Sequence, residues 1–153
     1  AFCQQIGSET DNLSYGEEGL TISVADEEIL LSEIQKSKTS HFLVAEEAGE
    51  IVGTCNCSAF RKKRLAHRAE IGITVKKAYW NQGIGRQLLT RLIAAAQQSG
   101  LKVLSLEVRS DNDRAIHLYD SLGFQKIGTF KHFMEIDDQA IDFDIMELLL
   151  EKK

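Results

Sequence analysis

The chain has 153 residues, of which 43% are hydrophobic and 27% are charged, and it carries a formal net charge of −5. These values predict one soluble globular domain over residues 1–153 with a real hydrophobic core. The negative charge argues against a nucleic-acid partner, the lack of a long apolar run argues against a membrane span, and three cysteines without a visible secretory signal indicate the reducing cytoplasm.

The first forty residues are predicted to hold helices and a loop. One side of a short helix is suggested by three apolar residues, Phe2, Cys3 and Ile6. Residues 8–19 are polar and typical of a loop. A second helix is predicted to begin after Ser23, with Asp26 as its capping-box partner.

Three strands are predicted in the next segment. Residues 41–47 and 50–60 read as a hairpin that turns at Ala48 and Gly49, and a third strand covers residues 70–75. Residues 61–68 form a basic connector before the third strand. Its run Arg61, Lys62, Lys63 and Arg64 is predicted to be a solvated loop, and the alternative is that it attracts coenzyme A phosphates or an acidic partner.

The second half of the chain predicts a strand–helix–strand unit followed by a helix and a hairpin. A helix over residues 83–99 that stops at Gly100 and a strand over residues 101–108 imply a parallel pair with a right-handed crossover. Ser110 and Asp113 are predicted to cap a helix that ends before Gly123. The last two strands are predicted over 124–134 and 140–149, with a turn at Asp137, Asp138 and Gln139. The expected fold is a single mixed α/β sheet, mostly antiparallel and twisted, with one central parallel pair and helices on both faces.

The stretch over residues 69–86 runs from a strand into a Gly-x-Gly step, Gly83 and Gly85, at a helix start. Glycines there let backbone amides approach a phosphate or pyrophosphate, which the helix dipole also favours. A Walker loop is excluded because Arg86 follows in place of Lys-Ser/Thr, and a dinucleotide fingerprint is excluded because Leu88 replaces its third glycine. A coenzyme A loop and a helix start without a ligand both remain open.

The stretch over residues 108–124, VRSDNDRAIHLYDSLGF, is the second informative motif. Together the two stretches resemble the GNAT superfamily of acetyl-coenzyme A-dependent N-acetyltransferases, over about residues 40–150. The first is similar to the family's glycine loop and the second to its Asn-x-x-Ala…Tyr…Leu-Gly-Phe segment. The resemblance implies acetyl transfer from acetyl-CoA to a primary amine by direct attack on the thioester. The alternatives are a non-catalytic coenzyme A-binding sensor or interaction module, and another kind of nucleotide-binding domain.

The resemblance also implies which residues contact the cofactor, acetyl-CoA. Backbone amides of the glycine loop would hold its pyrophosphate: Gln82, Gly83, Ile84, Gly85 and Arg86. The end of the preceding strand would contact the acetyl group and the pantetheine arm: Ile73, Thr74 and Val75. Asn112 matches the family asparagine that contacts the cofactor. Trp80 departs from the Arg or Gln usual at the first position of the loop motif, and the family's first strand is not evident before residue 19, so the chain is either shortened at its N-terminus or lacks that strand.

Two catalytic residues are predicted, each with a structural alternative. Tyr119 matches the tyrosine proposed to protonate the departing thiolate, whereas most helical tyrosines only pack. Glu70 resembles the glutamate base of some histone-acetylating members, and its alternative is an exposed strand-edge glutamate. His67 and His117 are expected to be structural or solvated.

No metal site is predicted, because Cys55 and Cys57 have no second ligand pair and fit buried small hydrophobes better. The acceptor is expected to be a small-molecule amine or a peptide amine, and the negative net charge favours cationic ones. A homodimer is expected by analogy with bacterial family members and from an apolar last strand over residues 145–150.

Overall fold

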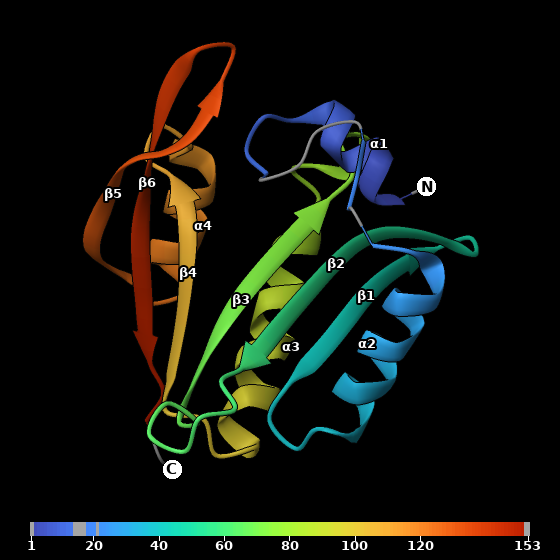
Figure 1. The fold of residues 1–153 in the computed structure, drawn as a ribbon, viewed down its shortest axis with the longest axis vertical. Coiled ribbons are helices and arrows are strands. Elements are labelled where there is room, and N and C mark those ends of the chain that lie inside the picture. Colours follow the sequence, from blue (N-terminus) through green and yellow to red (C-terminus); the bar gives the residue numbers. More distant parts are fainter. Residues whose placement is uncertain (1, 14–17, 21, 152–153) are drawn as a thin grey trace.

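The structure is a computed structural model that describes residues 2–13, 18–20 and 22–151 (Figure 1). Its elements, in chain order, are α1 (Phe2–Glu9), α2 (Val24–Lys36), β1 (His41–Glu47), β2 (Glu50–Ala59), β3 (Arg68–Val75), the 3₁₀ turn η1 (Lys77–Tyr79), α3 (Ile84–Gln98), β4 (Val103–Arg109), α4 (Asp113–Ser121), β5 (Gln125–Ile136) and β6 (Gln139–Leu149). The strands form one sheet in the order β1-β2-β3-β4-β6-β5. Among the described strands, β3 and β4 pair in parallel and all other pairs are antiparallel, so the expected mixed, mostly antiparallel sheet is confirmed.

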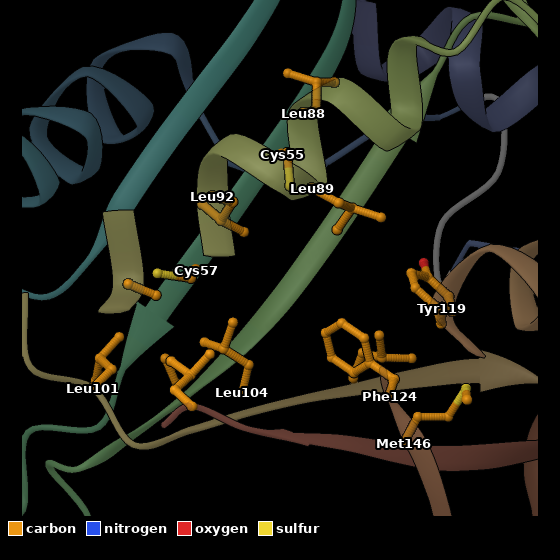
Figure 2. Packing of buried hydrophobic residues seen from close by; sticks show 14 of the residues in the cluster. Cys55, Cys57, Leu88, Leu89, Leu92, Leu101, Leu104, Tyr119, Phe124 and Met146 are labelled. Atoms are coloured by element: carbon orange, nitrogen blue, oxygen red, sulfur yellow. The ribbon is translucent and has the colours of Figure 1, made fainter. Parts of the chain in front are cut away.

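The main core lies on the face of the sheet that α3 and α4 cover (Figure 2). Leu89 and Leu92 of α3 are fully buried against Cys55 and Cys57 of β2, and Phe124 lies beneath α4. This burial confirms that the two cysteines behave as small hydrophobic residues and raises the pKa of Cys55 to about 12. α2 covers part of the opposite face, next to β1 (Figure 1).

The parallel pair is paired over three positions only. Arg68, Ala69 and Glu70 of β3 lie opposite Val103, Leu104 and Ser105 of β4, and no later residue of β3 is paired with β4. Beyond Glu70 the two strands diverge (Figure 1). The backbone of 71–75 therefore faces an opening in the middle of the sheet, and this opening positions the candidate site.

Both predicted tight turns are present, each with two residues in the left-handed region. Ala48 and Gly49 have φ angles of 50° and 81°, and Asp137 and Asp138 have 50° and 62°. Such pairs match the right-handed twist of a hairpin. Arg68, predicted to lie in the connector, belongs to β3.

One capping prediction is wrong. Asn112, not Ser110, caps α4, because the Asn112 side chain accepts a hydrogen bond from the Ala115 amide at 3.3 Å. The Ser110 hydroxyl instead donates to Asp144 of β6 at 2.7 Å. A contact between strands distant in sequence therefore removes Ser110 from the role that its local sequence favours.

The described part of the N-terminal region contains α1 and α2, and no strand precedes β1 within residues 2–13, 18–20 and 22–40. Part of the predicted loop over residues 8–19 lies outside the described residues. Among the helices that the structure describes, none has the length and apolar character needed to cross a membrane.

Candidate active site

A cavity of about 500 Å³ lies where β3 and β4 diverge. The open edge of β3, the start of α3, β4 and α4 all contribute to its lining. Eight of the nine residues predicted to bind the cofactor line it: Ile73, Thr74, Val75, Gly83, Ile84, Gly85, Arg86 and Asn112. The ninth, Gln82, does not line it, and its side-chain amide is directed back to the Ala78 carbonyl at 3.4 Å. The structure thus brings two sequence motifs together around one opening.

The start of α3 presents free backbone donors to this cavity. The first hydrogen bond of the helix runs from the Gln87 amide to the Gly83 carbonyl at 3.0 Å, so the amides of residues 84–86 have no partner within the helix. Gly83 has a φ of +79°, which favours glycine, and a Cβ there would meet no protein atom within 4 Å. The amides and the helix dipole make this end of the cavity suitable for a pyrophosphate.

Trp80 has a role that the sequence pattern did not reveal. Its indole N–H donates to the Val75 carbonyl at 2.8 Å, which fixes the turn between β3 and α3. The Arg114 guanidinium of α4 lies 4.6 Å from the centre of the Trp80 ring. Arg86, whose guanidinium donates to the Ser121 hydroxyl at 2.7 Å, is a second cation of the cavity. Two arginines next to the free amides strengthen the case for a phosphate-bearing ligand.

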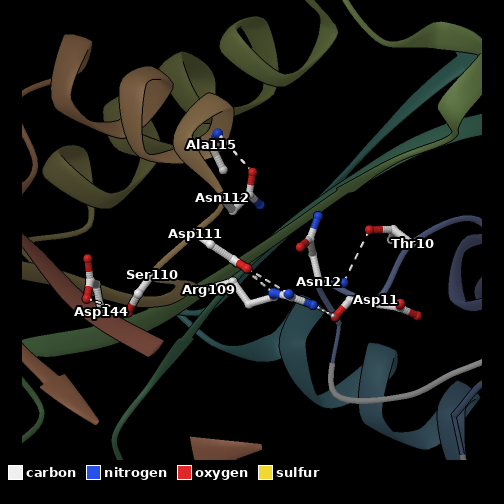
Figure 3. A network of polar contacts seen from close by, with 9 residues as sticks. All are labelled: Thr10, Asp11, Asn12, Arg109, Ser110, Asp111, Asn112, Ala115 and Asp144. Atoms are coloured by element: carbon white, nitrogen blue, oxygen red, sulfur yellow. Dashed lines mark hydrogen bonds and ion pairs between the residues drawn. The ribbon is translucent and has the colours of Figure 1, made fainter. Parts of the chain in front are cut away.

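Asn112 lies at the start of α4, on the same cavity (Figure 3). Its side-chain oxygen accepts the helix-capping hydrogen bond from Ala115. The amide NH₂ group of the same side chain is the part that stays available to donate to a ligand.

Tyr119 lies deep in the cavity and is 7% exposed. Its ring packs edge-on against Phe124, with 5.8 Å between ring centres (Figure 2). Burial raises the pKa of Tyr119 above its usual value, and electrostatic repulsion between the ionised forms of Tyr119 and Cys55 adds to this effect. The phenol is therefore protonated throughout the physiological pH range and can donate a hydrogen bond into the cavity.

The two carboxylates of this region occupy different positions. Glu70 is exposed, lies opposite Ser105 at the last position where β3 pairs with β4, and is absent from the lining of the cavity. Glu107 of β4 is also exposed, but it lines the cavity. Partial desolvation, and then the charge of Glu70, raise the pKa of Glu107 above its usual value.

Glu107 was missed by the sequence analysis, although a local signal existed. Its neighbours Leu106 and Val108 are buried in the core, and side chains alternate along a strand. Glu107 is therefore directed to the face of β4 opposite the core, next to Glu70.

A second, larger cavity of about 1030 Å³ lies on the opposite face of the sheet, between β1–β3 and the helices α1 and α2. Four residues line both cavities: Leu13, Gly72, Ile73 and Thr74. The open edge of β3 is therefore the place where the two cavities meet.

Residues 10–13 lie at this junction, and Arg109 of β4 holds them (Figure 3). The Arg109 guanidinium contacts the Asp111 carboxylate at 2.7 and 2.8 Å and donates to the Asp11 carbonyl at 3.3 Å. The short segment after α1 thus contributes to a site that is otherwise built mostly from residues 71–119.

The histidines and the basic connector are the remaining candidates from the sequence. Within the described residues, no group of three or more His, Cys, Asp or Glu side chains is placed to hold a metal ion. His117 is exposed on α4 and lines the first cavity, and the backbone carbonyl of His67 accepts from the Lys102 amide at 2.7 Å. Arg61 of the basic connector pairs with Glu33 on the surface.

Comparison with known proteins decides the family. The model of the acetyltransferase (GNAT) family matches residues 10–124, a range that includes both motifs and most of the cavity lining. The chain belongs to the GNAT family.

Relatives of this GNAT domain include several named enzymes. It is 35% identical over 100 residues to the N-alpha-acetyltransferase RimI of Mycobacterium tuberculosis, covering 65% of this chain and 61% of that protein. It is 30% identical over 112 residues to the L-amino acid N-acyltransferase MnaT of Escherichia coli, covering 72% of this chain and 65% of that protein. Each of these matches covers less than two thirds of the length of the relative.

Among solved structures, a GNAT-family acetyltransferase of Streptococcus pneumoniae superposes with a TM-score of 0.94 at 33% identity, covering 98% of this chain and 90% of that one. A ribosomal-protein-alanine N-acetyltransferase of Brucella melitensis superposes with a TM-score of 0.83 at 25% identity, covering 97% and 90%. The GNAT domain thus shares its whole described architecture with family members.

Proposed function

We propose that this GNAT domain transfers the acetyl group of acetyl-CoA to a primary amine, by direct attack of the amine on the thioester. The observation that carries the proposal is the arrangement along the gap between β3 and β4. Free amides and two arginines lie at one end of the cavity, and Tyr119 and Glu107 line it. This arrangement favours an enzyme over a non-catalytic binding module, because a module needs neither a buried phenol nor a carboxylate on the lining of its ligand cavity.

The residues present fit acetyl-CoA, which supplies the activated acetyl group. The amides at the start of α3, with Arg86 and Arg114, would bind the pyrophosphate. The unpaired edge of β3 over residues 73–75 offers backbone donors and acceptors to the pantetheine arm. The Asn112 amide would orient the same arm.

For the chemical step, Glu107 and Tyr119 would move protons at opposite ends of the reaction. Glu107 would take a proton from the attacking amine, directly or through water, and the raised pKa makes it a better base. The sequence predicted Glu70 as the base. In this proposal Glu107 is the base, and the negative charge of Glu70 raises the pKa of Glu107. Tyr119 would donate a hydrogen bond to the leaving sulfur.

The proposal is tested by measuring the release of free coenzyme A thiol from acetyl-CoA with a thiol-specific chromogenic reagent across a panel of amines. An acetyltransferase releases thiol in an amine-dependent manner. Binding of acetyl-CoA without release would instead favour the sensor or interaction module. Binding of ATP or NAD, with none of acetyl-CoA, would favour another nucleotide-binding domain.

The glycine at the start of α3 gives a first prediction. Gly83→Val should weaken acetyl-CoA binding by more than tenfold, because a side chain is strained at φ +79° and occupies the space in which the ligand approaches the amides. The measurement is calorimetric titration with acetyl-CoA. Gly100→Val is the matched control, since Gly100 lies at the other end of α3 with a φ of +86° and equally open surroundings. Equal affinities for the two variants would contradict the prediction.

We also propose a cytoplasmic homodimer. The three cysteines are free, as in a reducing compartment. The apolar last strand supports a dimer less than expected, because β6 is an interior strand and Met146 is buried. Exposed apolar side chains lie near the end of β6, at Leu149, and on the edge strand β5, at Ile127, Phe130 and Phe133. Light scattering at tens of micromolar should give the mass of a dimer, and a monomer mass would count against it.

A further inference from the structure

The second cavity gathers much of the exposed apolar surface of the domain. Three side chains on its lining are Leu20, Phe42 and Val44, which are 44%, 38% and 49% exposed. Ile22, Val24 and Ile51 are also exposed and line it. Large apolar side chains grouped around one hollow mark a binding site, since their contact with water is unfavourable.

The wall of this cavity on the side of α2 is loosely packed. No residue of α2 is buried, although Leu31 and Ile34 are directed to the cavity. A helix normally buries its apolar stripe against the rest of the protein. Here the apolar side of α2 faces a cavity of about 1030 Å³, which is large enough for the apolar group of a small ligand.

The charges of the cavity limit what can occupy it. No Lys or Arg lines it within the part of the chain that the structure describes, whereas Glu27 does. His41 also lines it, and burial lowers its pKa below the usual value, which favours the neutral imidazole. A carboxylate in this cavity would therefore find no Lys or Arg on the described lining and would lie near the carboxylate of Glu27.

The end of the cavity that meets the first cavity is polar. The hydroxyls of Thr54 and Thr74 lie 2.7 Å apart, and the Asn56 side chain lies beside Gly72. An acceptor held with its apolar part under α2 therefore has its amino group directed to the open edge of β3, where both cavities share Gly72 and Thr74.

We infer that the acceptor of this GNAT domain is a primary amine that carries a large apolar group and no carboxylate beside the amino group. The inference rests on the proposed function and names the substrate class of that site. It narrows the preference for cationic acceptors that the net charge of −5 suggested, because the lining of the cavity also requires a large apolar group beside the amine. An arylalkyl amine and the N-terminus of a peptide with an apolar first residue share this chemistry.

A thiol-release panel tests the inference. Phenylalaninamide should have a kcat/KM about 10- to 100-fold above that of glycinamide, because only the former fills the apolar cavity. Phenylalanine should be about tenfold worse than phenylalaninamide because of its carboxylate, and spermidine should resemble glycinamide. Phenethylamine and the dipeptide Phe-Ala separate the two sources of an apolar amine, and preference for either over glycinamide supports the inference.

Two substitutions on α2 form a matched pair. Leu31→Asp places a carboxylate in the cavity and should lower kcat/KM for phenylalaninamide at least about tenfold, with little change for glycinamide. Ile29→Asp lies on the same helix, is exposed and does not line the cavity, so it should change neither value. Val44→Ser repeats the test from β1, and calorimetry with acetyl-CoA checks that each variant is folded.

The outcomes separate this inference from the proposed function. Thiol release that does not discriminate between phenylalaninamide and glycinamide overturns the inference and leaves acetyl transfer standing. Equal effects of Leu31→Asp and Ile29→Asp on phenylalaninamide also overturn it. No amine-dependent release by a protein that binds acetyl-CoA overturns both.

Discussion

Replacing Tyr119 with phenylalanine should lower kcat by about ten- to a thousandfold and leave the affinity for acetyl-CoA nearly unchanged. The ring stays, and with it the edge-on contact to Phe124. Only the hydroxyl of a largely buried residue that lines the cavity is lost. An interaction made mainly in the transition state affects kcat far more than it affects binding.

The acidity of the two groups defines what Tyr119 can do. A thiol with a pKa near 8.5 is more acidic than an ordinary tyrosine near 10, so complete proton transfer is uphill by roughly 2 kcal/mol. Burial raises the pKa of Tyr119 and makes complete transfer harder still. A hydrogen bond to the sulfur needs no complete transfer, and it strengthens as negative charge develops.

Single-turnover measurements decide the question, because they isolate the chemical step. A Tyr119→Phe variant that acetylates at the parental rate under these conditions would identify Tyr119 as a packing residue. A loss confined to KM for acetyl-CoA would assign it to binding instead.

Glu107→Gln should lower kcat/KM by about a hundredfold or more near neutral pH and remove the acidic limb of the pH–rate profile. An alkylamine with a lysine-like pKa near 10.4 needs about 4.6 kcal/mol to become neutral at pH 7, and a peptide α-amine with a pKa near 8 needs about 1.4 kcal/mol, so a base beside the amine contributes most with alkylamine acceptors. Glu107 lines the cavity, and glutamine keeps its shape without its basicity.

Glu70→Gln tests the coupling between the two carboxylates. A carboxylate acts as a base only above its pKa, so activity falls as the pH decreases through the raised pKa of Glu107. Removing the negative charge of Glu70 lowers that pKa, so the acidic limb should move to lower pH while the plateau remains. Loss of activity in Glu70→Gln, with an active Glu107→Gln, would return the role of base to Glu70.

The positions of the glycines and of Tyr119 on the first cavity were predictable because their signals are local. These residues lie in continuous motifs, and one helix start or one helix turn fixes their positions. The hairpin turns were predictable for the same reason. The boundaries of most predicted strands then follow from alternation and turn residues alone.

The other parts of the site depend on contacts between distant segments. The Glu70–Glu107 interaction depends on the register of the parallel pair, and the Arg109–Asp11 contact joins residues 98 positions apart. Ser110 does not cap α4, because its hydroxyl donates a hydrogen bond to Asp144 of β6. The opening between β3 and β4 likewise has no local signal, because it arises where hydrogen bonds between strands stop.

The position of Trp80 gives the domain a built-in optical probe. It is the only tryptophan of the chain, and its indole lies on the lining of the first cavity under the Arg114 guanidinium. Indole emission responds to the polarity and charge around the ring, so occupancy of the first cavity is expected to change it without any label. Trp80 does not line the second cavity, so an amine bound there alone should leave the emission nearly unchanged. Tryptophan fluorescence therefore distinguishes a ligand of the first cavity from an amine bound in the second.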